Sequence, residues 1–257
     1  VYLGTKEYER LYEIDPIDST VLENGRFEFK GSVKIPQRRY IKIQHEFGSI
    51  PLFVENSRIS IKTTKEKYPD AEITGSITQN QYESYIEKED EYNDSIRILD
   101  QAIQKAISKD KKEKANNLGK RYSKLYKAKI AFIRDYILSD APSALRLFIY
   151  KKAWIVYPKS ILDSLYQSLD SSAYNTEIAE TLEKRIMDLE KVQPGEPYIN
   201  LTLKNISGKE VSLSDYVGQN YVLLYFVHPC PHIDLVPKGF KKLYQKSRGT
   251  CFKPICS

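Results

Sequence analysis

The sequence predicts a multidomain α+β protein, because the spacing of its apolar residues changes twice along the chain. Residues 1–78 alternate apolar and polar side chains, which predicts an antiparallel β-domain. Residues 79–192 repeat apolar side chains every three or four positions, which predicts a helical segment. Residues 193–257 return to short strand patterns around one continuous apolar run, which predicts a small α/β unit.

Composition and charge exclude several classes of protein. With 41% hydrophobic and 29% charged residues, the chain has the composition of a folded globular protein. The longest continuous apolar stretch, 221–227, is too short for a membrane-spanning helix. The net charge of +6 is spread along the sequence, so we expect no nucleic-acid partner. Because the chain opens at Val1 without a methionine or a signal peptide, we expect its start to be trimmed or processed.

Short alternating runs and turn residues define the β-domain. Turn signals at Asn24-Gly25, Phe47-Gly48 and Gly75-Ser76 separate the runs. His45 stands alone, and no nucleophile is grouped with a base, which favours a scaffold or docking module over a catalytic site. The expected strands contain Val1 with Leu3, Phe27 with Phe29, Ile41 with Ile43, and Ile59 with Ile61.

The helical segment contains three apolar stripes and a charged tract. The tract 108–117 is either a solvated helix face or the exposed turn of a long helical hairpin. Breaks at Asp140–Ser143 and Tyr157–Ser160 divide the segment into four or five helices. The stripes are Ile96, Leu99, Ile103 and Ile107; Leu125, Ala128, Phe132 and Tyr136; and Ile178, Leu182, Ile186 and Leu189.

Two prolines and a glycine in Gln193–Pro197 end the last helix and begin the C-terminal unit. The pattern there predicts two strands around a turn, one helical turn, a buried strand, a helix and a final strand. These elements are expected at 199–203, 211–213, 214–218, 221–227, 238–247 and 250–255, respectively.

The chemistry-bearing cluster His228, Cys230 and His232 follows the expected buried strand. A thiol between a strand and a helix lies near free backbone N–H groups and the positive end of the helix dipole, which stabilise a thiolate, and the adjacent imidazoles of His228 and His232 would add to this effect as catalytic partners. Cys230 is therefore a redox thiol, a buried or incidental thiol, or a metal ligand together with the two histidines. The metal alternative lacks an evident fourth ligand. All three cysteines fall near the C-terminus, which excludes a disulfide-stapled mini-protein.

Two motifs resemble a known domain arrangement. Pro194–Pro197 followed by NLTLKNISGKEVSLSDYVGQNYVLLYFV resembles the opening of periplasmic thioredoxin-like thiol-disulfide oxidoreductases of the TlpA and ResA type. That family reads G-x-x-A-P-x-F-x-L-x-D-x-x-G-K-x-V-x-L-S-D-x-x-G-K-x-V-L-L-x-F-W. The upstream motifs Ile17–Thr20, Asn24–Gly31 and Ile73–Ser76 resemble the uncharacterised N-terminal β-domain that precedes such domains in Bacteroidetes envelope proteins.

The resemblance implies a thioredoxin-like C-terminal unit that exchanges disulfides with envelope proteins. Protein thiols and disulfides would be its partners, Cys230 its nucleophile, and no cofactor is needed. Location in the periplasm or cell envelope is implied, with membrane attachment through an N-terminal lipid anchor outside this sequence. The resemblance assigns no oligomeric state.

The expected active site departs from the family pattern. No C-x-x-C is present: if Pro237 is the family's proline, the second cysteine falls on His232. The strands that complete a thioredoxin fold would follow Ser257, so we expect the unit to be incomplete. Cys256, at the end of the last expected strand, is the nearer partner for Cys230, whereas a core role is also open for it and for Cys251. The alternative function is a non-catalytic envelope lipoprotein that binds proteins through a degenerate thioredoxin-like domain.

Overall fold

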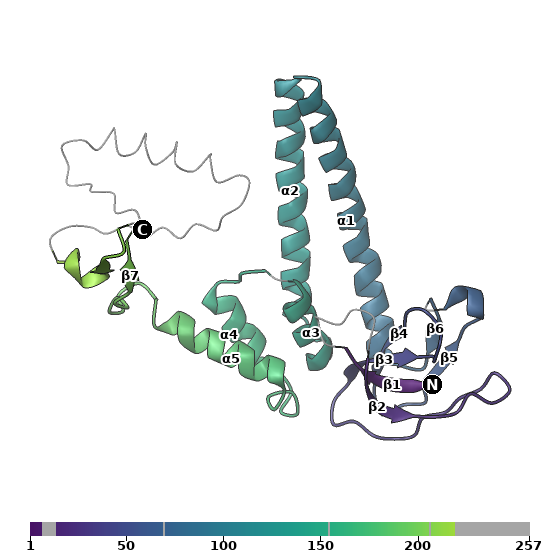
Figure 1. Ribbon diagram of the computed structural model, residues 1–257. Helices are drawn as coiled ribbons and strands as arrows, with labels where there is room; N and C mark the ends of the chain where they lie inside the picture. The colour runs from purple at the N-terminus through teal and green to yellow at the C-terminus, as the bar shows by residue number, and fades with distance from the viewer. Residues whose placement is uncertain (7–13, 69, 154, 206, 219–257) are drawn as a thin grey trace. The chain divides into compact units, whose positions relative to one another are not determined.

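The predicted α+β class is confirmed by a computed structural model, in which an antiparallel sheet precedes a helical region (Figure 1). The chain divides into two compact units, Val1–Glu190 and Lys191–Ser257. No helix among the described residues combines the length and the apolar character needed to cross a membrane. The described residues are 1–6, 14–68, 70–153, 155–205 and 207–218.

The β-domain is built on a four-stranded antiparallel sheet with the order β2-β1-β3-β4. Its buried residues Ile41 and Ile50 are paired across β3 and β4, so two of the four buried residues of this core are neighbours in the ladder. The strands are β1 (Tyr2–Thr5), β2 (Asp15–Ser19), β3 (Gln37–Lys42) and β4 (Ile50–Val54), and a second ladder pairs β5 (Ser60–Lys62) with β6 (Glu72–Thr74).

The expected strand at Phe27 and Phe29 is wrong. The Asn24-Gly25 turn is present with positive φ at both residues, but among the described residues it is flanked only by the single bridge between Glu23 and Arg26. Phe27 packs against the small β core, and its ring meets Phe29 edge-on at 6.0 Å between centroids. Alternation alone did not make a strand here, because a strand also needs a partner for its backbone groups.

Two long helices form an antiparallel hairpin, and the charged tract 108–117 combines both interpretations, because 109–111 form the exposed turn and 112–117 belong to the second helix. α1 (Ile77–Ser108) begins at the N-cap Ser76, whose side chain accepts a hydrogen bond from the Gln79 N–H at 3.0 Å. α2 (Lys112–Ile137) returns after a three-residue turn. The residues of the three predicted apolar stripes are buried or half-buried, with two exceptions. Ile107, at the tip of the hairpin, is 59% exposed, and Ala128 is also exposed.

Three shorter helices complete the first unit, which makes five among the described residues. α3 (Ser143–Ala153) follows the predicted break and buries residues on most of its circumference, as expected of a central helix. α4 (Lys159–Gln167) starts after Pro158, and α5 (Glu177–Glu190) packs against it. The fully buried side chains of this core include Phe53, Ile137, Leu145, Leu147, Ile149, Leu162, Leu165 and Leu182.

The second unit contains the predicted hairpin, with shorter strands than expected. β7 (Thr202–Lys204) pairs antiparallel with β8 (Glu210–Ser212), and a 3₁₀ turn, η2 (Leu213–Asp215), follows. The Asn205 side chain accepts hydrogen bonds from the backbone N–H groups of Ser207 and Lys209, both at 3.0 Å. The elements expected at 221–227, 238–247 and 250–255 lie outside the described residues.

Candidate functional site

The cysteine and histidine residues that the sequence proposes as a site fall outside the described part of the chain. These residues are His228, Cys230, His232, Cys251 and Cys256. The structure therefore neither groups nor separates them. His45 lies exposed in a turn with a φ of 65°, as part of the β-domain connections. Within the described ranges, no group of three or more His, Cys, Asp or Glu residues is arranged to hold a metal ion.

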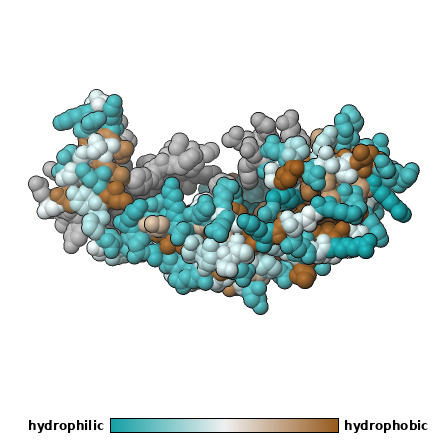
Figure 2. All heavy atoms as spheres, turned by 90° about the horizontal axis from the view of Figure 1, so that it is seen from below, coloured by the Kyte–Doolittle hydropathy of each residue, from teal (hydrophilic) through white to brown (hydrophobic). Residues whose placement is uncertain are grey.

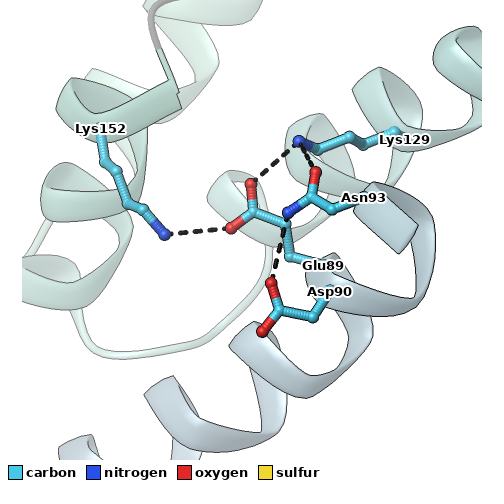
Figure 3. A network of polar contacts seen from close by, with 5 residues as sticks. All are labelled: Glu89, Asp90, Asn93, Lys129 and Lys152. Atoms are coloured by element: carbon cyan, nitrogen blue, oxygen red, sulfur yellow. Dashed lines mark hydrogen bonds and ion pairs between the residues drawn. The ribbon is translucent and has the colours of Figure 1, made fainter. Parts of the chain in front are cut away.

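A buried carboxylate network joins three helices and is the principal polar cluster that sequence reasoning missed (Figure 3). Glu89 of α1 is only 8% exposed, although it belongs to the acidic run 87–91. In the sequence this run has the appearance of a solvated helix face. Helical periodicity offers the one available signal, since Glu89 lies four residues after the buried Tyr85 and therefore on the same face.

Both oxygens of the Glu89 carboxylate are engaged by lysines from the neighbouring helices. Lys129 of α2 places its Nζ 3.3 Å from Oε1, and Lys152 of α3 places its Nζ 3.1 Å from Oε2. Lys129 also donates to the Asn93 side-chain oxygen at 2.6 Å, and Asn93 in turn donates to Asp90 at 3.3 Å. The network therefore fixes the positions of α1, α2 and α3 relative to one another.

Tyr85 lies beside this network and is almost completely buried. Burial, followed by the negative charge of Glu89, raises the pKa of Tyr85 above its usual range. The ring stacks on Phe132 with a centroid separation of 5.4 Å and meets Tyr136 edge-on at 4.7 Å. A protonated tyrosine and a carboxylate saturated by two ammonium groups form no nucleophile–base pair, so this cluster acts as a structural clamp.

Arg38 forms a second joint, between the sheet and the helices. Its guanidinium carbon lies 4.7 Å from the Tyr82 ring centroid, 5.1 Å from that of Phe53 and 5.7 Å from that of Phe148. Its Nε and Nη1 are buried and have no hydrogen-bond partner among the described residues. The electron-rich faces of three rings provide the compensating attraction. Arg38 therefore joins the sheet to α1 and α3 through ring contacts.

Arg146 makes a third buried connection, at the start of α3. Its guanidinium donates to the Ser168 carbonyl at 2.7 Å and to the Ser143 hydroxyl at 3.1 Å, and that hydroxyl donates to Asp170 at 2.7 Å. Burial lowers the pKa of Arg146, and the charges of Asp170 and Asp140 oppose this shift. The cluster fastens α3 to the loop after α4 and contains no reactive group.

A hollow that is open to solvent lies between the start of α1 and the loop after α2. Its volume of about 360 Å³ lies near the lower end for small-molecule sites. Tyr136 donates a hydrogen bond to the Gln81 carbonyl at 3.3 Å at this place, and burial raises its pKa. The lining consists of Asn80, Gln81, Ser84, Tyr136, Ser139, Asp140 and Ala141. The hydroxyls of Ser84 and Ser139 donate to the backbone carbonyls of Asn80 and Tyr136 and not to the Asp140 carboxylate, so the lining presents no nucleophile activated by a base.

The surface seen in Figure 2 carries its hydrophobic residues in separate small patches among hydrophilic ones. The described residues on that face therefore do not form the large continuous apolar patch that is typical of an extensive permanent interface.

Comparison with known families gives one match. Residues 1–82 match the family model described as Domain of unknown function (DUF4369). This match covers the β-domain and the first residues of α1, which is 82 of the 257 residues. No curated protein and no solved structure matches the chain. The match assigns no ligand or activity to the β-domain.

Proposed function

We propose that this chain is a thiol-disulfide oxidoreductase of the cell envelope, whose C-terminal unit carries the chemistry and whose first unit docks proteins. The supporting observation is the order of elements in Thr202–Asp215, where a hairpin leads into a 3₁₀ turn. The thioredoxin-like domains that the sequence resembles have the same order ahead of their catalytic strand. Ser212 and Asp215 close the turn with a reciprocal capping box, so this lead-in is locally well defined.

The proposed reaction is disulfide exchange. The Cys230 thiolate attacks one sulfur of a substrate disulfide, and the other sulfur leaves as a thiolate and takes up a proton. The mixed disulfide is then resolved by an incoming thiol, either Cys256 or a thiol of a second protein. The two sulfurs of the substrate end as thiols, while the two attacking thiols become a disulfide.

The first unit supports the docking part of the proposal. Its buried polar groups, including Glu89, Arg38 and Arg146, join helices and sheet and leave no catalytic arrangement among the described residues. A β-domain and a long helical hairpin offer a large surface for protein recognition. Periplasmic or envelope location, with a lipid anchor, is part of the same proposal.

The proposal is tested by the alkylation rate of each cysteine between pH 5 and pH 9, measured by mass spectrometry with iodoacetamide. Cys230 should react faster than Cys251 and Cys256, with a midpoint below the ~8.5 of a free thiol. A Cys230→Ser variant should form no mixed disulfide with an oxidised model peptide. A Cys230 midpoint at or above that of a free thiol would rule out the nucleophile.

The second candidate function is a non-catalytic docking protein of the envelope. It is favoured by one observation, the lack of a C-x-x-C motif around Cys230. The two candidates differ in one measurement. If the wild-type chain and the Cys230→Ser variant reduce the oxidised peptide at the same negligible rate while folding equally, the redox function is ruled out, which leaves the docking function.

A further inference from the structure

One exposed face of α1 carries an ordered series of charges. Its residues are spaced by three or four positions, which places them on one side of the helix, away from the stripe that packs on α2. All of them are exposed in the structure. They are Glu87, Glu91, Asp94, Ile98, Gln101, Lys105 and Lys109, the last of which is the C-cap residue.

Two pairs of these side chains lie at equal distances from Ile98 along the sequence and carry opposite charges. Glu91 and Lys105 each lie seven residues from Ile98, and Glu87 and Lys109 each lie eleven. Ile98 is 60% exposed and is the apolar side chain at the centre of this charged face. This face is therefore acidic in its first half, apolar at its centre and basic in its second half.

We propose that this face binds a second copy of the chain, with the two α1 helices antiparallel and a twofold axis beside Ile98. Antiparallel pairing places Glu91 of one copy opposite Lys105 of the other, and Glu87 opposite Lys109. Because the arrangement is twofold, each of these ion pairs occurs twice and the two Ile98 side chains meet. A parallel pairing would place like charges together, so the charge order also selects the orientation.

The length of the hairpin makes such a contact possible. α1 has 32 residues, roughly 48 Å of helix, and the α1–α2 hairpin extends away from the β-domain (Figure 1). Glu91 and Asp94 already contact Lys88 and Arg97 of their own helix, but these pairs are exposed and exchange readily with other partners. The dimer is accordingly weak and sensitive to salt.

The test is sedimentation velocity of the full chain at low and high salt over a range of concentrations. The wild-type chain should form dimers at low salt that dissociate as salt increases. Two double variants, Glu87→Lys with Glu91→Lys and Lys105→Glu with Lys109→Glu, should each raise the dimer dissociation constant at least tenfold. A mixture of the two should form a heterodimer, and the quadruple variant should recover the homodimer.

A matched control reverses the same number of charges elsewhere. Lys120→Glu with Lys124→Glu changes exposed residues of α2 and should leave the dissociation constant within about twofold of wild type. Ile98→Asp, which places two negative charges at the axis, should also prevent the dimer while retaining the helical circular dichroism.

Three results would overturn the proposal. These are a wild-type chain that stays monomeric at all concentrations at low salt, a dimer that neither double variant weakens, and a quadruple variant that remains monomeric although folded. If a double variant fails to fold, Ile98→Asp decides: a folded variant that still dimerises like wild type refutes the contact at Ile98. None of these results depends on the redox chemistry of Cys230.

Discussion

The side-chain oxygen of Gln79 accepts a hydrogen bond from the backbone N–H of Phe53 at 3.0 Å, which joins the first turn of α1 to the edge strand β4. Both residues are buried. The contact is reciprocal, because Glu55, just after β4, accepts hydrogen bonds from the backbone N–H groups of Ile77 and Thr78 at the start of α1. Thus the helix covers the edge of the sheet, and the sheet caps the helix.

Replacing Gln79 should test this joint. Gln79→Met keeps the length of the side chain but leaves the buried Phe53 N–H without an acceptor, so we expect a loss of about 1–3 kcal/mol in unfolding free energy. Urea denaturation followed by circular dichroism measures this loss. The exposed neighbour Asn80, changed to Ala, should alter stability by less than about 0.5 kcal/mol. Equal effects of the two changes would contradict the role of Gln79.

The Glu89 clamp predicts a larger effect from a buried charge than from an exposed one. Glu89→Gln removes the negative charge between Lys129 and Lys152, and we expect a loss of about 1–3 kcal/mol in unfolding free energy. Glu91→Gln breaks an exposed pair with Lys88 and should cost at most about 0.5 kcal/mol. Chemical denaturation of both variants under the same conditions makes the comparison. A smaller loss for Glu89→Gln than for Glu91→Gln would show that the clamp does not hold the helices.

Replacement by alanine should change the stability of the protein in opposite directions at two glycines. Gly75 has a φ of +91°, and a Cβ there would lie 2.1 Å from the Arg58 carbonyl oxygen, so Gly75→Ala should lose more than about 2 kcal/mol. Gly119 lies inside α2 with nothing within 4 Å of a new Cβ, so Gly119→Ala should gain about 0.5–1 kcal/mol. Thermal unfolding of each variant measures the sign, and a stabilised Gly75→Ala would refute the close approach of the Arg58 backbone.

Because Tyr157 is buried, we expect the protein to lose stability at high pH. Burial raises the pKa of Tyr157 to about 12, with Arg134 opposing the shift. In the unfolded chain this phenol ionises at a pH of ~10. The contribution of the protonated Tyr157 to the free energy of unfolding is therefore fully present below pH ~10 and is lost as the pH rises to about 12. Urea denaturation at pH 8, 10 and 11.5 should show this decline.

The variant Tyr157→Phe separates this tyrosine from the others. It should reduce the decline at high pH and leave stability at pH 8 unchanged or up to about 1 kcal/mol higher, since the hydroxyl has no hydrogen-bond partner among the described residues. The exposed Tyr126, changed to Phe, is the control and should leave the pH profile as in wild type. A profile for Tyr157→Phe that matches wild type throughout would argue against the burial of this phenol.

Local sequence patterns were sufficient to predict the elements that are stabilised by residues close to one another in the sequence. The stripe containing Leu99 and Ile103 lies on the face of α1 toward α2, and the charged tract forms the turn of the hairpin. The Asn205 turn and its two short strands were predicted because a side chain closes the turn locally. Periodicity and turn chemistry act over a few residues, so they can be read without the fold.

Only the tertiary structure determined which charged side chains are buried and which alternating segments form strands. Phe27 and Phe29 alternate like a strand but lack a strand partner, while Glu89 looks like a surface residue and is buried between lysines 40 and 63 positions away in the sequence. The rings around Arg38 likewise come from a neighbouring strand and two helices. The reason is physical: burial of a charge is favourable only when distant partners compensate its lost hydration, and those partners are brought together only by the folded chain.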